Sequence, residues 1–544
     1  MSNLADAASR SVSAPPVALY SDASFAVQIA TFATLQDALG AASQGQAIDI
    51  FDPNAIGALG VIDVLIEDLT IRADDPFFAT FWLKGSANNF NLLGDTNSEV
   101  IGTLDADVVT GGDGDNILFV RRGDDIVFGG KGDDFLISSN GTDVLNGGAG
   151  NDSLLGGLDA DTLDGGSDTT GDSAYYSGSN VGVTIDLSAG TAFGGHAEGD
   201  VLIGIEHLFG SRWGDDLRGD AQNNVLTGYV GSDTLDGRDG DDNLVGGLDA
   251  DHLISGLGAD TMNGGVGAGD HADYSGSNAA VIIGVNSGAV NSGGHAEGDV
   301  ITTNTENLTG SAFADQITGN TLNNVLIGGF GNDTINASSG NDTVQGGEGD
   351  DLLLGSRGAD LIDGGAGADT ASYANSDALV IVDLAAGTAI GSGHSFGDTL
   401  ISIEGAIGSQ FHDSLFGDGG NNSLRGLNGS DDLFGAAGDD TLVGDGGKDT
   451  LTGGTGNDVL NGGAEIDTFV FDTANFGADT ILRFGAGFGA GCELMDFRGS
   501  GVSFSDLTIW SAAGDTVVSV TSDPANQITL VGIASGIDAS DFLF

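Results

Sequence analysis

The chain has 544 residues, 96 of them glycine, and its 80 acidic residues against 14 basic ones give a net charge of −66 at pH 7. Such a charge excludes a nucleic-acid or anionic-membrane binder that works by neutralising phosphates. Because 40% of the residues are hydrophobic, as in folded proteins, the repulsion among the carboxylates predicts bound cations rather than disorder. The single cysteine, Cys492, allows no intramolecular disulfide, and no apolar run approaches the ~18 residues of a transmembrane helix.

Residues 1–30 are predicted to form a flexible leader, with neither the basic nor the apolar region of a cleaved secretory signal. Residues 31–101 are predicted to form a cap, in which 32–53 indicates a short amphipathic helix leading into a strand. Apolar, strand-like runs follow, such as FATFWL at 78–83. The pattern resembles the capped start of a right-handed parallel β-helix, as in pectate-lyase-like proteins. A cap covers strand edges that an open solenoid end leaves unpaired, and three or four coils are too few for a carbohydrate-cleaving groove.

From Gly102 onward the sequence repeats every nine residues. Ungapped blocks of nonapeptides cover 102–164, 210–263, 310–372 and 408–470, in 27 units that include GGKGDDFLI and GGAGNDSLL. Position 8 of the unit is apolar in all 27 units, and position 6 is aspartate in 23 of them. The other four units carry an asparagine at position 6: Asn116, Asn224, Asn324 and Asn422. A solvated low-complexity tract would not keep both columns in phase, so we expect a repeat fold.

The two columns predict half a coil of a solenoid for each unit. The apolar residue of position 8, with its two neighbours, indicates a very short strand with one inward side chain. The six glycine-rich residues before it indicate a turn, because glycine reaches positive φ without steric cost. Units n and n+2 would then stack at roughly 4.8 Å, the hydrogen-bonding distance between strands.

Stacked turns would bring the position-6 carboxylates into a column along each edge of the solenoid. Without screening, like charges this close repel by about 1 kcal/mol per pair even in water. Carboxylate and turn carbonyl oxygens together suit Ca²⁺, which accepts six to eight oxygen ligands, better than Mg²⁺, which demands a tight octahedron. The sequence therefore predicts multiple calcium sites and an all-β parallel β-roll or β-solenoid in four blocks.

Six units, among them GGFGNDTIN, GGEGDDLLL and GGTGNDVLN, match the pattern GGxGxDxUx, and in this the chain resembles the RTX (hemolysin-type) calcium-binding proteins. The resemblance covers about 370 residues, from 102 to 471. It implies Ca²⁺ between stacked turns, bound by position-6 aspartates and turn carbonyls. The aspartates so implicated are Asp125, Asp134, Asp143, Asp152, Asp161, Asp233, Asp242, Asp251, Asp260, Asp333, Asp342, Asp351, Asp360, Asp369, Asp431, Asp440, Asp449 and Asp458. The turn glycines implicated with them are Gly129, Gly147, Gly328, Gly346, Gly364 and Gly453.

Several units depart from the pattern, and we expect weak or empty sites there. VRRGDDIVF lacks the leading glycine pair, GSRWGDDLR and GSQFHDSLF carry an aromatic residue at position 4, and the asparagine units lose a charge. If every stacked pair bound one ion, the four blocks would hold at most roughly 19.

Three spacers, 173–209, 270–309 and 370–407, separate the blocks and resemble one another. Tyr176, Tyr274 and Tyr373 recur at intervals of 98 and 99 residues, and His196, His295 and His394 recur every 99. The chain therefore contains a larger module of about 99 residues, a block plus a spacer of short strands.

The third spacer contains GHSFG, at 393–397, which fits the G-x-S-x-G turn of an α/β-hydrolase nucleophile. Its counterparts in the other spacers read GHAEG, with Ala197 and Ala296 where Ser395 stands. The following residues are too rich in glycine and serine for the helix that this turn requires. We therefore expect no catalysis by Ser395.

The spacer histidines are each followed four residues later by an aspartate: His196 by Asp200, His295 by Asp299 and His394 by Asp398. A metal site or an acid–base pair is one interpretation. A structural turn, repeated with the module, is the other and the one that we favour. Asp186 and Asp383 have a glycine at the matching place in the second spacer, Gly284, which argues against a shared catalytic carboxylate.

After Phe471 the nine-residue period ends. Residues 473–544 contain alternating apolar runs such as DTVVSV and end in DFLF, and they resemble the C-terminal region of type I secretion substrates. The resemblance implies an uncleaved secretion signal in this region, beside its role as a β-rich cap.

The sequence therefore predicts a secreted, extracellular or surface-associated protein that folds on binding Ca²⁺ after export by type I secretion machinery. A structural or matrix role is favoured over a non-catalytic remnant or accessory of an RTX-linked extracellular enzyme, such as a polysaccharide epimerase, lyase or hydrolase. A pore-forming toxin is the third alternative, which the lack of a long apolar segment disfavours. No catalytic residues are predicted, and cell-surface polysaccharide is a candidate partner. The predicted domains are 1–30, 31–101, 102–172, 173–269, 270–369, 370–472 and 473–544.

Overall fold

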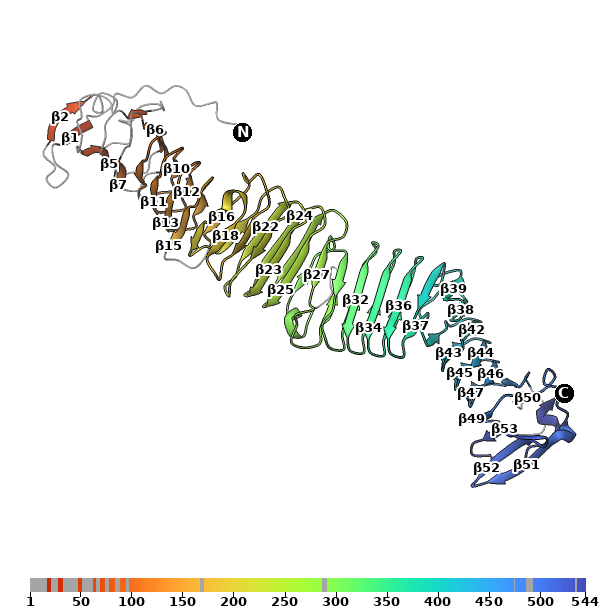
Figure 1. Ribbon diagram of the computed structural model, residues 1–544. Coiled ribbons are helices and arrows are strands. Elements are labelled where there is room, and N and C mark those ends of the chain that lie inside the picture. The colour runs from red at the N-terminus through yellow and green to blue at the C-terminus, as the bar shows by residue number, and fades with distance from the viewer. Residues whose placement is uncertain are drawn as a thin grey trace. The chain divides into compact units, whose positions relative to one another are not determined.

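The computed structural model describes residues 97–166, 171–285, 291–473, 475–485, 493–533 and 536–544, and before these the strands β1 to β7. Contacts divide the chain into two compact units, Met1–Asp270 and His271–Phe544, and each is described by itself. Within each unit, short strands from successive coils stack side by side into parallel sheets (Figure 1). The fold is an all-β parallel β-solenoid, as predicted.

Each nonapeptide forms half a coil. β10 (Ile117–Phe119) pairs in parallel with β12 (Phe135–Ile137), eighteen residues further along the chain. The strand between them in sequence, β11 (Ile126–Lys131), lies in a second sheet, where it pairs with β13 (Val144–Ala149). Units n and n+2 therefore stack directly, which confirms the predicted coil.

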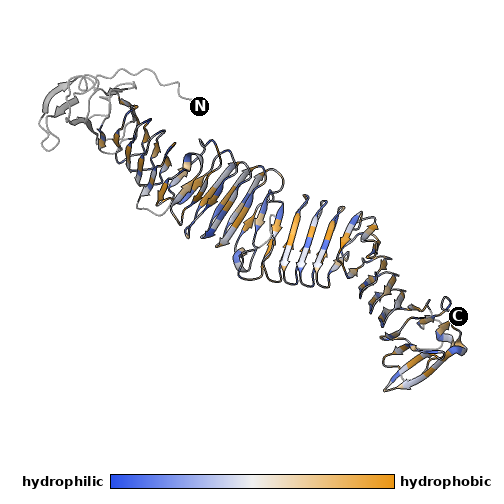
Figure 2. Ribbon diagram, in the orientation of Figure 1, coloured by the Kyte–Doolittle hydropathy of each residue, from blue (hydrophilic) through white to orange (hydrophobic). Residues whose placement is uncertain are grey.

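The apolar side chains of position 8 form the core of both units. All 27 of them are at most 1% exposed, for example Leu118, Leu235 and Leu451. Their strand neighbours point outward, and Ile117 is 39% exposed. Hydrophobic and hydrophilic residues therefore alternate along the strands (Figure 2). Burying one leucine of this kind contributes about 1.5–3 kcal/mol to stability.

In the first unit, strands that precede the nonapeptide repeats in the chain also pair in parallel, as expected for a β-helix-like cap. β4 (Ile62–Val64) pairs in parallel with β6 (Phe78–Leu83), and β5 (Leu69–Ala73) pairs in parallel with β7 (Asn89–Leu93). β3 (Ala47–Ile50) forms the strand expected within 32–53, and the helix expected before it lies outside the described residues.

Two further strands lie in or next to the predicted leader. β1 (Val17–Tyr20) and β2 (Gln28–Phe32) form an antiparallel pair, and β1 also pairs with β3.

The first spacer inserts an antiparallel meander into one sheet without breaking it. β15 (Thr162–Gly166) pairs in parallel with β19 (Val201–Ile203), which pairs antiparallel with β18 (Thr191–Phe193). β18 in turn pairs antiparallel with β17 (Thr184–Asp186), and β17 pairs in parallel with β21 (Asp216–Arg218), the first strand of the next block.

The other sheet of the first unit runs past this spacer as a parallel stack. β14 (Ser153–Leu155), β16 (Ser173–Tyr175), β20 (His207–Phe209) and β22 (Val225–Val230) pair in that order. The spacer therefore interrupts the regular coil at one sheet only.

The second unit contains the same arrangement at the third spacer. β36 (Leu361–Ala366) pairs in parallel with β40 (Asp398–Ile401), and the antiparallel strands β39 (Thr388–Gly391) and β38 (Val380–Asp383) follow. β38 then pairs in parallel with β42 (Ser414–Phe416). The strands predicted in the spacers are thus present as a meander.

Residues 473–544 close both sheets at the end of the second unit. In one sheet, β47 (Val459–Ala464) is followed by β49 (Ala478–Ile481), β53 (Asp523–Leu530), β52 (Asp515–Val520) and β51 (Leu507–Ala512). The pairing changes from parallel to antiparallel between β53 and β52.

In the other sheet, β48 (Thr468–Val470) pairs with β50 (Leu494–Asp496), which pairs with β54 (Phe542–Leu543). Phe497, 1% exposed, lies within 5.1 Å of the Phe471 ring and within 5.7 Å of the Phe544 ring, measured between centroids. The segment forms the β-rich cap that the alternating apolar runs predict.

Helical structure within the described residues is limited to four single 3-10 turns. None of the helices seen there is long and apolar enough to cross a membrane.

Candidate metal-binding ladders

The position-6 side chains stack into hydrogen-bonded ladders along the coil edges. The backbone N–H of Asp134 donates to Oδ1 of Asp152, one coil further, at 2.7 Å. In the second unit the N–H of Asp333 donates in the same way to Asp351, also at 2.7 Å. We call each such aspartate a rung of its ladder.

All eighteen predicted calcium-binding aspartates are rungs. Each is at most 3% exposed, and Oδ1 of each accepts an N–H hydrogen bond of 2.6–2.9 Å from the preceding rung. One carboxylate oxygen of each rung is therefore used in holding the coils together.

The second oxygen, Oδ2, has no hydrogen-bond partner in seventeen rungs, although it is buried. These rungs are Asp125, Asp134, Asp143, Asp161, Asp233, Asp242, Asp251, Asp333, Asp342, Asp351, Asp360, Asp369, Asp431, Asp440, Asp449, Asp458 and Asp467. Asp152 and Asp260 occupy the same ladders. A buried carboxylate oxygen without a partner is costly, so these oxygens require a ligand or a proton.

The first glycine of the unit keeps space open beside Oδ2. A Cβ atom on Gly129 would overlap Oδ2 of Asp134 and the carbonyl oxygen of Gly147, one coil further. The carboxylate and a backbone carbonyl therefore border the same small space. The six predicted turn glycines all lie against a rung in this way: Gly129, Gly147, Gly328, Gly346, Gly364 and Gly453.

The glycines of positions 2 and 4 are needed for a different reason. Gly130 has a φ of 116° and Gly132 a φ of 98°, which side-chain-bearing residues rarely adopt.

Burial raises the pKa of many of the unsatisfied rungs above their ordinary value of 3.8. The pKa of Asp134 rises to about 8 and that of Asp125 to about 7, first because of desolvation and then because of neighbouring carboxylates. The N–H bond to Oδ1 opposes this rise without cancelling it. Without a cation, burial therefore shifts the carboxyl groups of Asp134 and Asp125 toward their protonated form.

The donor set of the ladders fits calcium. The oxygens that border the open space are carboxylate and carbonyl oxygens, the hard ligands that Ca²⁺ prefers. Within the residues that the structure describes, no three carboxylate, imidazole or thiol side chains gather around one point. Backbone carbonyls of the turns are thus the further ligands that the arrangement offers, as the sequence predicts.

In a second class of rung, both carboxylate oxygens accept hydrogen bonds from the protein. In Asp215, Oδ2 accepts the N–H of Ser211 at 2.6 Å, and Oδ1 accepts its hydroxyl at 2.8 Å and the N–H of Val183 at 2.7 Å. Thr103 bonds Asp107 in the same way. The other members of this class are Asp315, bonded by Ser311, and Asp413, bonded by Ser409.

The asparagine rungs are satisfied too. Oδ1 of Asn224 accepts the N–H of Asp220 at 2.8 Å, and its amide donates to the carbonyl of Glu206 at 2.9 Å. Asn324 and Asn422 donate equivalently to Glu306 and Glu404.

Each block therefore begins with two rungs whose side-chain oxygens already accept hydrogen bonds from the protein. For GSRWGDDLR and GSQFHDSLF this supports the expectation of weak sites, although the serine of position 2, rather than the aromatic residue, is the cause. VRRGDDIVF differs from expectation, because Oδ2 of its Asp125 is as buried and unsatisfied as in the regular units.

Sequence reasoning missed several rungs. Asp172, Asp270 and Asp479 accept the N–H of Asp152, Asp251 and Asp458, at spacings of 20, 19 and 21 residues instead of 18. Insertions at the ends of the first, second and fourth blocks move them out of phase. Asp467 is in phase and accepts the N–H of Asp449 at 3.0 Å. A glycine pair followed by any aspartate within eight residues is the signal that finds all but Asp479.

The serine of GHSFG has no nucleophile geometry. Ser395 is 0% exposed, and the strand β40 begins at Asp398, where the nucleophile turn requires a helix.

The spacer aspartates bond to tyrosine rather than to the histidines nearby. Asp200 accepts the hydroxyl of Tyr176 at 3.0 Å, while the backbone N–H of His196 donates to the hydroxyl of Ser179 at 3.2 Å. This favours the structural interpretation of the repeated His and Asp.

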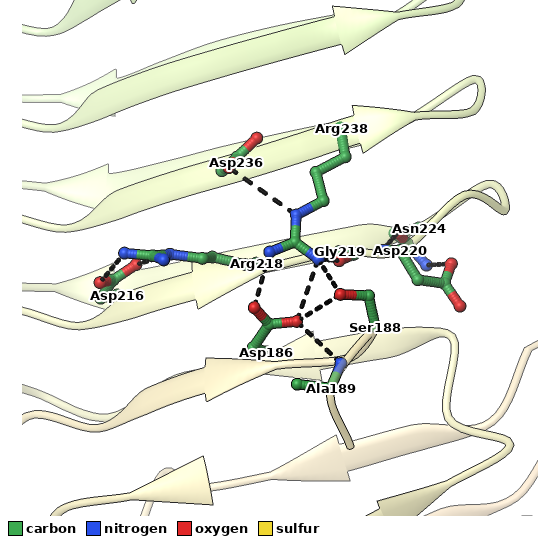
Figure 3. Close-up of polar contacts among 10 residues, drawn as sticks. All are labelled: Asp186, Ser188, Ala189, Asp216, Arg218, Gly219, Asp220, Asn224, Asp236 and Arg238. Atoms are coloured by element: carbon green, nitrogen blue, oxygen red, sulfur yellow. Dashed lines mark hydrogen bonds and ion pairs between the residues drawn. The ribbon is translucent and has the colours of Figure 1, made fainter. Parts of the chain in front are cut away.

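Asp186 forms an ion pair (Figure 3). Two nitrogens of Arg238 donate to its two oxygens, at 3.0 and 2.6 Å, and Ser188 and the N–H of Ala189 add two more hydrogen bonds. Arg238 also donates to the carbonyl of Gly219 at 3.0 Å. These bonds lower the pKa of Asp186 to about 2, which suits a structural ion pair and not a proton-transfer group.

The fold and its ladders define a parallel β-roll with buried carboxylate columns. The model of the RTX calcium-binding nonapeptide repeat matches the four blocks, at residues 101–136, 137–169, 214–244, 236–269, 309–344, 336–371, 407–442 and 434–469. The chain belongs to the RTX calcium-binding nonapeptide repeat proteins, whose repeats bind Ca²⁺ and which are generally secreted.

Two solved structures are similar over part of their length. The extracellular lipase LipA from Serratia marcescens is 23% identical with a TM-score of 0.21, and the match covers 42% of this chain and 40% of the lipase. The AlgE6R3 subunit of the mannuronan C5-epimerase from Azotobacter vinelandii is 27% identical with a TM-score of 0.15, and the match covers 25% of this chain and 81% of that subunit. No curated protein sequence matches the chain.

Proposed function

We propose that this protein works outside the cell as a calcium-loaded β-roll that folds when it meets extracellular Ca²⁺. The observation that carries the proposal is the set of seventeen buried rungs whose Oδ2 has no hydrogen-bond partner. Calcium, when bound, supplies positive charge and coordination to these oxygens.

Repulsion among the carboxylates makes folding depend on Ca²⁺. Inside a cell, where free Ca²⁺ is scarce, the net charge of −66 opposes compaction and the rungs would be buried without a partner. Outside, near-millimolar Ca²⁺ can fill sites with Kd of about 10⁻⁴–10⁻³ M, the range of extracellular modules. Because the sites exist only in the folded chain, binding free energy becomes folding free energy.

The route of export belongs to the same proposal. An unfolded, acidic chain suits type I secretion, and the segment 473–544 is the proposed carrier of the signal. This segment pairs onto both sheets of the last block, so the same residues also cap the folded roll.

The proposed role is structural or surface-associated, without catalysis. In support, the residues that most resemble catalytic ones have structural surroundings: Ser395 is fully buried, Asp186 is paired with Arg238, and Asp200 is bonded to Tyr176. Cell-surface polysaccharide is the proposed partner class. Incubation with alginate, casein and p-nitrophenyl esters tests this role, and turnover of any of them would contradict it.

The deciding experiment is a calcium titration of the chelator-stripped chain, followed by far-UV circular dichroism and small-angle scattering, with Mg²⁺ as the control. A cooperative change from coil to β-structure with compaction, at Ca²⁺ of about 10⁻⁴–10⁻³ M and absent with Mg²⁺, is expected. A chain that is already folded and compact at pH 8 in chelator would overturn the proposal.

A further inference from the structure

Every spacer carries a buried tyrosine whose hydroxyl donates to a buried aspartate. Tyr176 donates to Oδ2 of Asp200 at 3.0 Å, with both residues at most 3% exposed. The same bond is present in the other two spacers: Tyr274 to Asp299 at 2.7 Å and Tyr373 to Asp398 at 3.0 Å.

Two of these aspartates, Asp200 and Asp398, are rungs of the same ladders as the calcium-binding candidates. The N–H of Asp161 donates to Oδ1 of Asp200 at 2.9 Å, and the N–H of Asp360 donates to Oδ1 of Asp398 at 3.0 Å. Oδ1 is thus used as in the calcium-binding candidates. The difference lies in Oδ2, which has a donor here and none in Asp161 or Asp360.

The ladder ends at this rung. The strand that follows Asp200, β19, is covered by the antiparallel β18 rather than by a further parallel coil. The N–H of Asp200 accordingly donates to the carbonyl of Ala197 within its own turn, at 3.3 Å, and not to another carboxylate. The glycine-rich turn that borders the open space in the blocks is therefore replaced by the meander.

On the far side of the spacer, the next ladder begins with a rung that is also satisfied. Asp215 has three protein donors, two from Ser211 and one from Val183. The serine–aspartate pair recurs after the other spacers, as Ser311 with Asp315 and Ser409 with Asp413.

We propose that in each spacer the tyrosine hydroxyl takes the place of a calcium ion at the aspartate that it bonds, so that each spacer is a calcium-free joint along the coil edge that carries this pair. This inference rests on the proposed binding of calcium by the unsatisfied rungs. Tyr176, Tyr274 and Tyr373 then determine where calcium is excluded, and the aspartates that they bond are structural.

The test counts bound calcium on the folded full-length chain by equilibrium dialysis. The triple variant Asp200→Asn, Asp299→Asn, Asp398→Asn keeps an acceptor for the ladder N–H, and its amide can bond the tyrosine oxygen. We expect it to bind as many ions as the wild type. The matched control, Asp143→Asn, Asp242→Asn, Asp342→Asn, changes three rungs with unsatisfied Oδ2 and should lose one ion for each. Equal losses in both triples would overturn the inference, and no loss in the control would instead contradict the proposed function.

A second set of variants tests the hydroxyl itself. Tyr176→Phe, Tyr274→Phe and Tyr373→Phe, combined, leave Oδ2 of three last rungs without a donor, as in the calcium-binding candidates. This variant should bind additional calcium, up to one ion per joint, whereas Tyr175→Phe, which removes a hydroxyl from the neighbouring, outward-facing residue, should bind the wild-type number. An unchanged number in the triple variant would show that the hydroxyl does not exclude calcium. If the triple variant fails to fold, the asparagine variants still decide whether the joints hold ions.

Discussion

The two oxygens of a rung have different surroundings, and this difference predicts which aspartates matter for calcium. Oδ1 of Asp134 accepts the N–H of Asn116 at 2.7 Å, while Oδ2 is buried without a partner. In Asp215 both oxygens have donors. Rungs that look the same in the repeat therefore divide into those that need a cation and those that do not.

Replacing Asp134 by asparagine should remove one calcium ion per chain and raise the Ca²⁺ midpoint of folding. The amide keeps the acceptor for Asn116 and loses the charge that attracts the ion. Asp215→Asn is the matched control, since its three donors leave no need for a cation, and it should leave the ion count unchanged. Calorimetric titration measures both, and equal effects would mean that hydrogen bonding at the rung does not select the sites.

Replacing Gly129 by alanine should destabilise the calcium-loaded fold by about 1–3 kcal/mol, because the new Cβ would overlap Oδ2 of Asp134 and the carbonyl of Gly147. Gly419 is the control, because a Cβ there meets nothing within 4 Å, and Gly419→Ala should change stability by less than about 0.5 kcal/mol. Urea unfolding at saturating calcium measures the difference. A Gly129→Ala variant as stable as the control would mean that the turn can shift to make room.

At the scale of the element, the repeat could be predicted and the joints could not. A nine-residue period with two columns specifies the strand, the turn and the stacking, because each follows from local geometry. The bond from Tyr176 to Asp200 crosses a meander, and nothing in the spacing of these residues indicates it. Likewise the serine of position 2 is visible in the sequence, but its two bonds to Asp215 become evident only when the turn is folded.

The pair of Asp186 and Arg238 illustrates the same limit. The two residues are 52 apart in sequence, and Arg238 occupies position 2 of its unit, where its φ of 75° replaces that of a glycine. A side chain in such a strained position indicates that its contacts outweigh the strain. The pair fixes the hairpin of the first spacer onto the following block.

Replacing Arg238 by lysine should lower the stability of the first unit by about 1.5–3 kcal/mol, since lysine cannot form the paired bonds to Asp186. Arg218→Lys is the control, because the pair of Arg218 with Asp216 is more exposed and should contribute less than about 1 kcal/mol.

The pKa of Asp186, lowered to about 2, gives this prediction a pH dependence. Because the folded value lies below the ordinary 3.8, the contribution is present above about pH 4 and is lost as the pH falls toward 2. Urea unfolding of both variants at pH 7 and at pH 3 measures it. A difference between Arg238→Lys and wild type that does not shrink at pH 3 would contradict the ion-pair origin.

For the whole molecule, the raised pKa values of the rungs predict that acid stabilises the calcium-free fold. In the folded chain the pKa values of Asp134, Asp233 and Asp242 are about 8, above the ordinary aspartate pKa of 3.8. Between pH 3.8 and about pH 8 the folded chain therefore binds more protons than the unfolded chain. Stability without calcium is therefore highest at low pH and falls as the pH rises toward 8.

In chelator, we expect more β-structure and a smaller radius at pH 5 than at pH 8, by circular dichroism and scattering. The range stays above the isoelectric point of about 4.1, where precipitation would interfere. With saturating calcium the same pH change should have little effect, because the ions replace the protons. A calcium-free chain that gains β-structure as the pH rises would contradict the ladder as the source of this dependence.

The last segment of the molecule has two proposed roles, and the fold separates them. Phe542 is 5% exposed, β54 pairs with β50, and the ring of Phe497 lies within 6.1 Å of Phe542 and within 5.1 Å of Phe471. A secretion signal in 473–544 is therefore built into the folded cap, so transport machinery could read it only before folding.

Deleting 473–544 should abolish export and also raise the Ca²⁺ midpoint of folding, because both sheets of the last block lose the strands that cover them. Phe497→Ala distinguishes the two roles: it removes the ring at the centre of the aromatic cluster, at a cost of about 3–5 kcal/mol, without shortening the chain. We expect this variant to be exported at the wild-type level but to fold at a higher calcium concentration. Export is measured as the secreted fraction in a host with type I secretion machinery, and folding as the calcium titration of the purified chain. If Phe497→Ala lost export as fully as the deletion, the separation of the signal from the packing of the cap would be wrong.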